Sequence, residues 1–214
     1  MSSSALVDLF VEDSAHEALL RALVRRIAVE EGLTVIVRIR SAQGGRGRVL
    51  GELRNYFVLL QKGLLDQPRL IVAAIDANCS RLAAKSSEIA EAAPEPYRTL
   101  LVTACPDPHV ERWYMADLSS FHQVVGATPR IRKRKCVRGY YKKALLDAIR
   151  KAGHPATLGG IEFAEDLVAA MHFYAAAKAD TSLGAFLTDM RAALRSLAAE
   201  ELSGGIHNQP PRLT

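Results

Sequence analysis

Apolar residues in the N-terminal half of the chain follow two alternating patterns. Short, mainly apolar runs that are typical of strands cover residues 5–11, 33–39, 70–75 and 99–104, and the run over 70–75 is unbroken, as in a strand buried on both faces. Between these runs, apolar residues recur at helical spacing over residues 15–31, 50–64 and 81–93. Regular alternation with short connections predicts an α/β fold, a parallel sheet of about four strands with right-handed crossovers and helices on both faces.

Beyond Pro106 the pattern becomes helical. Helices are predicted over residues 110–117, 137–152, 161–177 and 183–199. We therefore expect an α/β domain over residues 1–125, a helical extension packed on it over 126–202, and a mobile tail over 203–214. In such sheets, ligands bind at the carboxyl ends of the strands.

Composition narrows the class of protein. The chain has 214 residues, of which 49% are apolar and 24% charged, so it is neither disordered nor a membrane span. No basic region, apolar stretch and cleavage site precede the first strand, and we expect a cytoplasmic protein. Cys79, Cys105 and Cys136 are odd in number and widely spaced, so reduced thiols are predicted.

Acidic residues follow three of the four predicted strands. Glu12 comes after the first strand and Asp76 after the third, and Glu111 and Asp117 lie just past the fourth. A parallel sheet gathers these positions along one edge, where carboxylates suit Mg²⁺ or Mn²⁺. Such an ion can activate water against a phosphodiester. The alternative is that each acid only caps the helix after it.

Two of these positions carry a resemblance to a known fold. Val11-Glu12-Asp13, and Ile75-Asp76-Ala77-Asn78 after the third strand, resemble the Toprim fold of topoisomerases, primases and OLD-family nucleases. There, a glutamate and an Asp-x-Asp pair hold a divalent metal. Residues 106–117 are similar to the "IE-x-W-x-x-AD" stretch of a Toprim-like family often associated with ABC or AAA ATPases in phage defence.

The resemblance implies roles for individual residues. Glu12 would be a general base or metal ligand, Asp76 the main ligand, and Glu111 a further catalytic acid. Asn78 stands where the family has the second aspartate and would ligate without charge, with Asp117 in support. The predicted function is a divalent-metal-dependent nuclease acting on DNA or RNA, as the effector of a phage-defence system.

Lys85, beyond the Asp76 loop, is a candidate for offsetting charge in the transition state, although a surface lysine is the alternative.

Asp13 stands where the family usually has glycine, and Asn78 brings no charge. A catalytically inactive adaptor or regulatory subunit, which binds an ATPase partner through its helical part, is therefore a competing hypothesis.

The chain has a net charge of +5, and two of its segments are rich in basic residues. Residues 128–143 form the densest basic run, where phosphates could be neutralised and Tyr140 and Tyr141 could stack on bases. A solvated surface, or a patch for an acidic protein, is the alternative. A glycine-rich loop after the second strand is the other basic segment, and its predicted nucleic-acid contacts are Arg46 and Arg48. The predicted contacts in the basic run are Arg130, Arg132, Lys133, Arg134, Lys135, Tyr140 and Lys142.

Two histidines lie beside the acidic positions. His16 falls in the first turn of the first predicted helix, and His109 precedes Glu111. A lone histidine in such a place is more often a cap or surface residue than a base.

Overall fold

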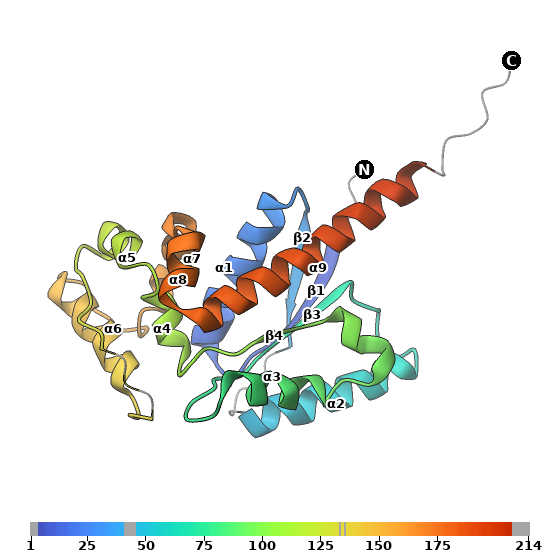
Figure 1. Ribbon diagram of the computed structural model, residues 1–214, viewed down its shortest axis with the longest axis horizontal. Helices are drawn as coiled ribbons and strands as arrows, with labels where there is room; N and C mark the ends of the chain where they lie inside the picture. Colours follow the sequence, from blue (N-terminus) through green and yellow to red (C-terminus); the bar gives the residue numbers. More distant parts are fainter. Residues whose placement is uncertain (1–3, 41–45, 133, 135, 207–214) are drawn as a thin grey trace, which may run out of the picture.

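The computed structural model describes residues 4–40, 46–132, 134 and 136–206. Its centre is a four-stranded sheet in the order β2-β1-β3-β4, in which all neighbouring strands are parallel. The predicted fold class, a parallel sheet flanked by helices with a helical C-terminal part, is confirmed (Figure 1). The strands are β1 (Ala5–Phe10), β2 (Val35–Ile39), β3 (Leu70–Ala74) and β4 (Leu101–Ala104).

The central strands β1 and β3 define the place where a ligand would bind. They pair from Val7 with Leu70 to Phe10 with Ala73, so their carboxyl ends lie side by side. From β1 the chain crosses to β2 on one side, and it later returns to β3 on the other. The switch in direction therefore lies between β1 and β3, and open α/β sheets bind ligands at such a point.

Helices cover both faces of the sheet (Figure 1). One cluster of buried residues joins α1 (Ser14–Glu30) and α9 (Thr181–Ile206) to the sheet. A second cluster joins α2 (Arg46–Gln61) and α3 (Leu82–Ala90) to the opposite face. The remaining elements are η1 (Glu95–Leu100), α4 (Val110–Tyr114), α5 (Leu118–Val125), α6 (Tyr140–Lys151), η2 (Ile161–Phe163), α7 (Ala164–Ala170) and α8 (Phe173–Ala179).

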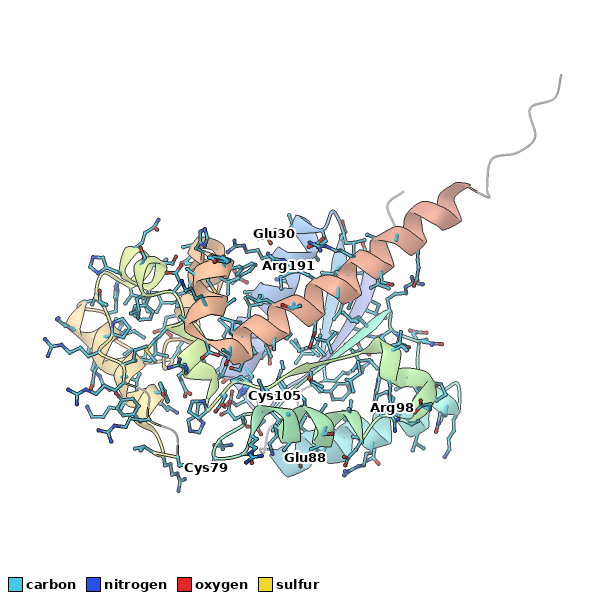
Figure 2. All side chains as sticks on the ribbon, viewed as in Figure 1. Glu30, Cys79, Glu88, Arg98, Cys105 and Arg191 are labelled. Carbon is cyan, nitrogen blue, oxygen red and sulfur yellow. A yellow bond between two sulfur atoms is a disulfide. The ribbon has the colours of Figure 1, made fainter. Side chains whose placement is uncertain are left out.

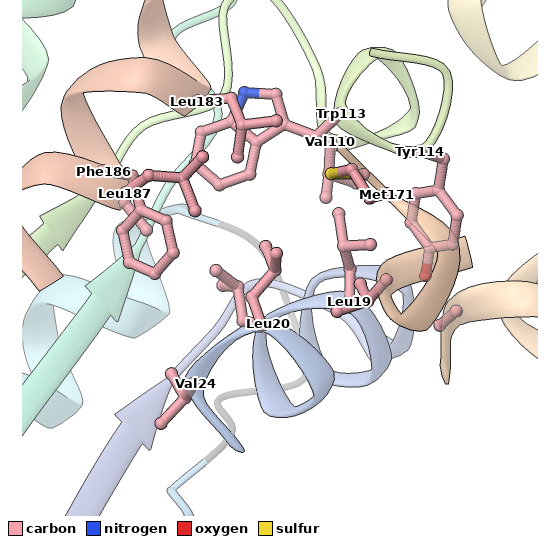
Figure 3. Packing of buried hydrophobic residues seen from close by; sticks show 14 of the residues in the cluster. Leu19, Leu20, Val24, Val110, Trp113, Tyr114, Met171, Leu183, Phe186 and Leu187 are labelled. Carbon is pink, nitrogen blue, oxygen red and sulfur yellow. The ribbon is translucent and has the colours of Figure 1, made fainter. Parts of the chain in front are cut away.

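Helix α4 is anchored by a tryptophan between α1 and α9. Trp113 is fully buried, and its ring stacks on Phe186 with centroids 5.5 Å apart. The indole N–H donates to Ser182 Oγ at 2.8 Å, which satisfies the polar edge of this large side chain. Leu19 and Leu20 of α1 complete the packing (Figure 3). This contact holds the segment after β4 against α1.

The helical part differs from the prediction at its breaks. The helix predicted over 110–117 ends at Tyr114, and α5 follows it because Asp117 caps a new helix. The helix predicted over 161–177 is divided into η2, α7 and α8, with His172 as the N-cap of α8. Helices α5 and α8 therefore begin where a polar side chain, Asp117 or His172, accepts a hydrogen bond from a backbone N–H group of the first turn.

The C-terminal helix is longer than predicted. Helix α9 continues to Ile206, within the segment for which a tail is predicted, and residues 207–214 lie outside the described part. Among the described helices, none has both the length and the apolar character of a membrane span.

The expectation of three reduced thiols is wrong for two of them. Cys79, in the loop after β3, and Cys136, before α6, form a disulfide with Cα atoms 5.0 Å apart. Cys105 is free and buried against α3 (Figure 2), and burial raises the pKa of its thiol to about 11. The pairing could not be read from the spacing, because 57 residues separate its partners.

Removing the disulfide should destabilise the protein. We expect Cys79→Ser to lower the free energy of unfolding by about 2–4 kcal/mol in urea titrations without reductant, because the bond restricts a long loop of the unfolded chain. In excess dithiol reductant, the variant and the unaltered protein should have the same stability. A difference that persists in reductant would show that the side chain, and not the bond, is responsible.

Candidate metal centre

The first side of the site is built at the start of α1. Asp13 is extended and caps the helix, because its Oδ1 accepts hydrogen bonds from the backbone N–H groups of Ala15 and His16, both at 3.0 Å. The cap places His16 in the first turn, where it is fully buried. Glu12 lies directly before the cap, beyond the carboxyl end of β1.

Asp76 builds the second side beyond the neighbouring strand β3. Glu12, His16 and Asp76 each place one oxygen or nitrogen atom in a cluster whose atoms lie within 4.8 Å of one another. The predicted convergence of Glu12 and Asp76 is therefore present. The pattern of strand ends identified both carboxylates, whereas it did not identify His16 as part of the cluster.

His16 lies between two carboxylates. Its Nδ1 is 2.9 Å from Asp13 Oδ1, and its Nε2 is 3.0 Å from Asp76 Oδ1. Burial by itself lowers the pKa of His16, but the hydrogen bonds to these two carboxylates outweigh burial and raise the pKa to about 10. His16 is thus an imidazolium at neutral pH that donates from both nitrogens, and it has no lone pair left for a metal.

Asp76 accepts hydrogen bonds from three directions. Besides His16, the backbone N–H of Val110 donates to Oδ1 at 2.9 Å, and His109 Nδ1 lies 3.0 Å from Oδ2. Burial raises the pKa of Asp76, yet the two histidines lower it further, so the carboxylate is ionised. A carboxylate has about four lone-pair sites, and one on Oδ2 is still available.

Glu12 is less well satisfied. Its Oε1 is buried and has no hydrogen-bond partner among the described residues. Burial raises the pKa of Glu12 to about 7, and the charges of Asp76 and Asp13 add to the effect against the opposing charge of His16. A buried carboxylate oxygen beside a second carboxylate is costly unless a cation accompanies it. The donor set fits a hard divalent cation such as Mg²⁺ or Mn²⁺.

Glu111 and His109 lie next to this cluster. Glu111 is in the first turn of α4, and burial, with a further contribution from the Asp76 charge, raises its pKa. It does not belong to the group of three that surrounds one point. The hydrogen bond to Asp76 raises the pKa of His109, whose side chain is 20% exposed and reaches solvent.

Two further predicted ligands have other contacts. Asn78 is exposed and left-handed at φ 51°, and its Nδ2 donates to the Asp76 carbonyl at 3.3 Å. The carboxylate of Asp117 accepts hydrogen bonds from the backbone N–H groups of Ser119, Ser120 and His172. The structure therefore assigns Asp117 to the helix cap and not to the metal centre.

Lys85 is not at the surface. It is 3% exposed on α3, and its Nζ pairs with Glu88 Oε2 at 2.7 Å. A lysine held by a carboxylate of its own helix has little charge to spare for a transition state, so the structure does not bring Lys85 into the carboxylate cluster.

The tyrosines of the basic run hold the backbone in place. The Tyr140 hydroxyl accepts from the Arg132 N–H at 2.8 Å, and the Tyr141 hydroxyl accepts from the Arg134 N–H at 3.1 Å. The two rings meet edge to face at 5.1 Å, and Tyr141 is buried. Because Tyr141 is buried, its suggested stacking on an unpaired base is wrong. Tyr140 is half-buried.

The described cations of this run face solvent. Arg130, Arg132, Arg134 and Lys142 are exposed. Arg48 pairs with Glu52 at 3.2 Å in the first turns of α2, which begins at Arg46. Lys133, Lys135 and residues 41–45 of the predicted glycine-rich loop lie outside the described residues.

Comparison of the chain with protein-family models, curated proteins and solved structures finds no match. The fold and site define an α/β protein with a carboxylate and histidine cluster at the switch point of a parallel sheet.

The charge of His16 can be tested through stability. We expect His16→Asn to lower the free energy of unfolding by about 1.5–3 kcal/mol near pH 6, because the exposed Asp13 and the partly buried Asp76 lose the cation that they share. The exposed control His122→Asn should change it by less than about 0.5 kcal/mol.

The effect of His16→Asn on stability should depend on pH. The pKa of His16 is raised on folding, so its contribution is complete below pH 6.5 and is lost as pH rises toward about 10. The difference between His16→Asn and the unaltered protein should therefore shrink over this range in urea titrations without metal. A difference that stays constant would contradict a buried imidazolium.

Proposed function

We propose that this chain is a divalent-metal-dependent phosphodiesterase that cleaves DNA or RNA. The observation that carries the proposal is the buried, unpartnered Oε1 of Glu12, which lies beside the Asp76 carboxylate at the switch point of the sheet. The hydrogen bonds of the described residues leave a place for one more cation there, and hard oxygen donors select Mg²⁺ or Mn²⁺.

Glu12 and Asp76 would hold the ion, and Glu111 adds negative charge beside them. A bound divalent ion supplies charge stabilisation and lowers the pKa of water. The protein contributes orientation, because His16, His109 and the Val110 N–H fix the Asp76 carboxylate from three sides.

His109 is suited to move a proton. Its Nδ1 is held by Asp76, and its raised pKa keeps the ring protonated to higher pH than a free histidine. The Nε2 has no hydrogen bond to another described residue, and the side chain reaches solvent. In this proposal His109 Nε2 donates a proton to the leaving oxygen of the cleaved strand.

The exposed arginines of residues 128–143 are proposed to bind the strand through its phosphates. An ABC- or AAA-type ATPase partner and a role in phage defence belong to the same proposal through the resemblance to Toprim-like proteins. We also propose a cytoplasmic location, where the Cys79–Cys136 disulfide would be an exception to the usual reduced state of thiols.

A second candidate is a catalytically inactive adaptor or regulatory subunit that binds an ATPase. The observation that favours it is the His16 imidazolium, which already neutralises charge between Asp13 and Asp76. Asn78 adds no charge to the site. In this case the folded protein would have no need of a metal, and metal titration separates the two candidates.

Replacing Glu12 should remove metal binding and cleavage but raise the stability of the metal-free protein. Glu12→Gln should abolish Mn²⁺ binding in calorimetric titrations and cleavage of DNA and RNA. At pH 8 without metal it should raise the free energy of unfolding by about 1–3 kcal/mol, because ionising a carboxyl whose pKa is raised to about 7 opposes folding.

The exposed Glu91→Gln is the matched control and should change none of these quantities. Full Mn²⁺-dependent cleavage by Glu12→Gln would contradict the proposed ligand. Absence of metal binding in the unaltered protein would favour the adaptor.

Asn78→Asp should tighten Mn²⁺ binding by about tenfold if the oxygen of this side chain turns to the ion, since it restores a charged ligand. Both residues tolerate the left-handed φ of 51°, so stability should change little. Unchanged affinity in calorimetry would mean that the side chain stays on the Asp76 carbonyl.

A further inference from the structure

A pocket of about 240 Å³ lies on the loop that joins β4 to α4. Its wall includes Pro108, Arg112, Arg134, Tyr141, Lys178 and Thr181. We propose that this pocket binds a backbone phosphate of the nucleic-acid strand, next to the phosphodiester that reaches the metal centre. The assignment of the strand rests on the proposed function, whereas the pocket is defined by its own residues.

The cations of the pocket are unequal. Arg112 is already neutralised, because its Nε donates to Asp180 Oδ2 and its Nη2 donates to the Ala179 carbonyl at 3.0 Å. Arg134 and Lys178 are exposed, and neither has an acidic partner among the described residues. These two side chains are therefore free to bind an anion.

The acidic groups of the wall do not cancel this charge. Asp180 is paired with Arg112, and its other oxygen caps α9 through the N–H groups of Ser182 and Leu183. Asp107 also makes an interaction of its own, and the two charges of Arg134 and Lys178 outweigh its single negative charge. Because the end of α9 already has a carboxylate cap, Arg134 and Lys178 carry the binding, and the helix terminus does not.

The pocket is joined to the metal centre by the loop that carries Pro108 and His109. Pro108 lines the pocket, and its carbonyl accepts a hydrogen bond from the Asn78 N–H at 2.9 Å. The next residue, His109, binds Asp76. Phosphates follow one another about every 3.4 Å along the axis of a helical strand. In the proposal, neighbouring phosphates of one strand lie on the two sides of this short loop.

The size and chemistry favour a phosphate over a protein segment. Pockets for drug-sized ligands start at about 300 Å³, so this one suits a smaller group. The fork of Arg134 matches the oxygens of a phosphate, and the Lys178 ammonium adds a point charge.

The test compares two double variants with the same loss of charge. Arg134→Gln with Lys178→Gln removes both pocket cations, and Arg54→Gln with Lys62→Gln removes two exposed cations at α2. Binding of a short fluorescein-labelled single-stranded DNA is followed by fluorescence anisotropy in EDTA over a series of NaCl concentrations. The pocket variant should bind roughly tenfold more weakly, and its salt slope should fall by about 1.4.

The outcomes separate the pocket from the proposed function. An equal effect of both double variants overturns the pocket, since net charge alone then explains binding. Loss of binding to a polyglutamate peptide, with DNA binding unchanged, also overturns it and indicates an acidic protein partner. If the unaltered protein fails to cleave with Mn²⁺ while DNA binding depends on Arg134 and Lys178, the nuclease proposal fails and the phosphate pocket stands.

Discussion

The hydrogen bonds to the Asp76 carboxylate join three parts of the chain that are distant in sequence. They link the end of β3 to α1 through His16, and to the start of α4 through His109 and the Val110 N–H. A buried carboxylate needs such partners, because burial otherwise favours its neutral form. The position of Glu12 and the course of the loop that carries Pro108 both depend on this arrangement.

The balance of charge explains how the site can fold and still bind an ion. His16 offsets the repulsion between Asp13 and Asp76 from within the protein, so these two carboxylates need no metal to stay together. Glu12 has no comparable partner for its Oε1. An ion would therefore complete an existing site and would not have to create one, which lowers the cost of ordering on binding.

The basic run is tied to the same edge of the sheet. Tyr140 and Tyr141 fix its backbone through hydroxyl groups, and Cys136 connects it to the loop that follows Asp76. Arg134 is thereby held at the pocket beside Pro108. The tyrosine hydrogen bonds and the disulfide therefore give this charged segment a fixed position beside the site.

The sequence by itself determined the sheet and most helices, because apolar periodicity is a local property. It also determined that Glu12 meets Asp76, because the carboxyl ends of parallel strands lie at one edge of a sheet. It could not distinguish a helix cap from a ligand at Asp117, nor a surface histidine from a buried cation at His16. Those outcomes depend on which groups approach from elsewhere in the chain. Only the tertiary structure decided them, since desolvation and hydrogen bonding between distant segments set both charge and role.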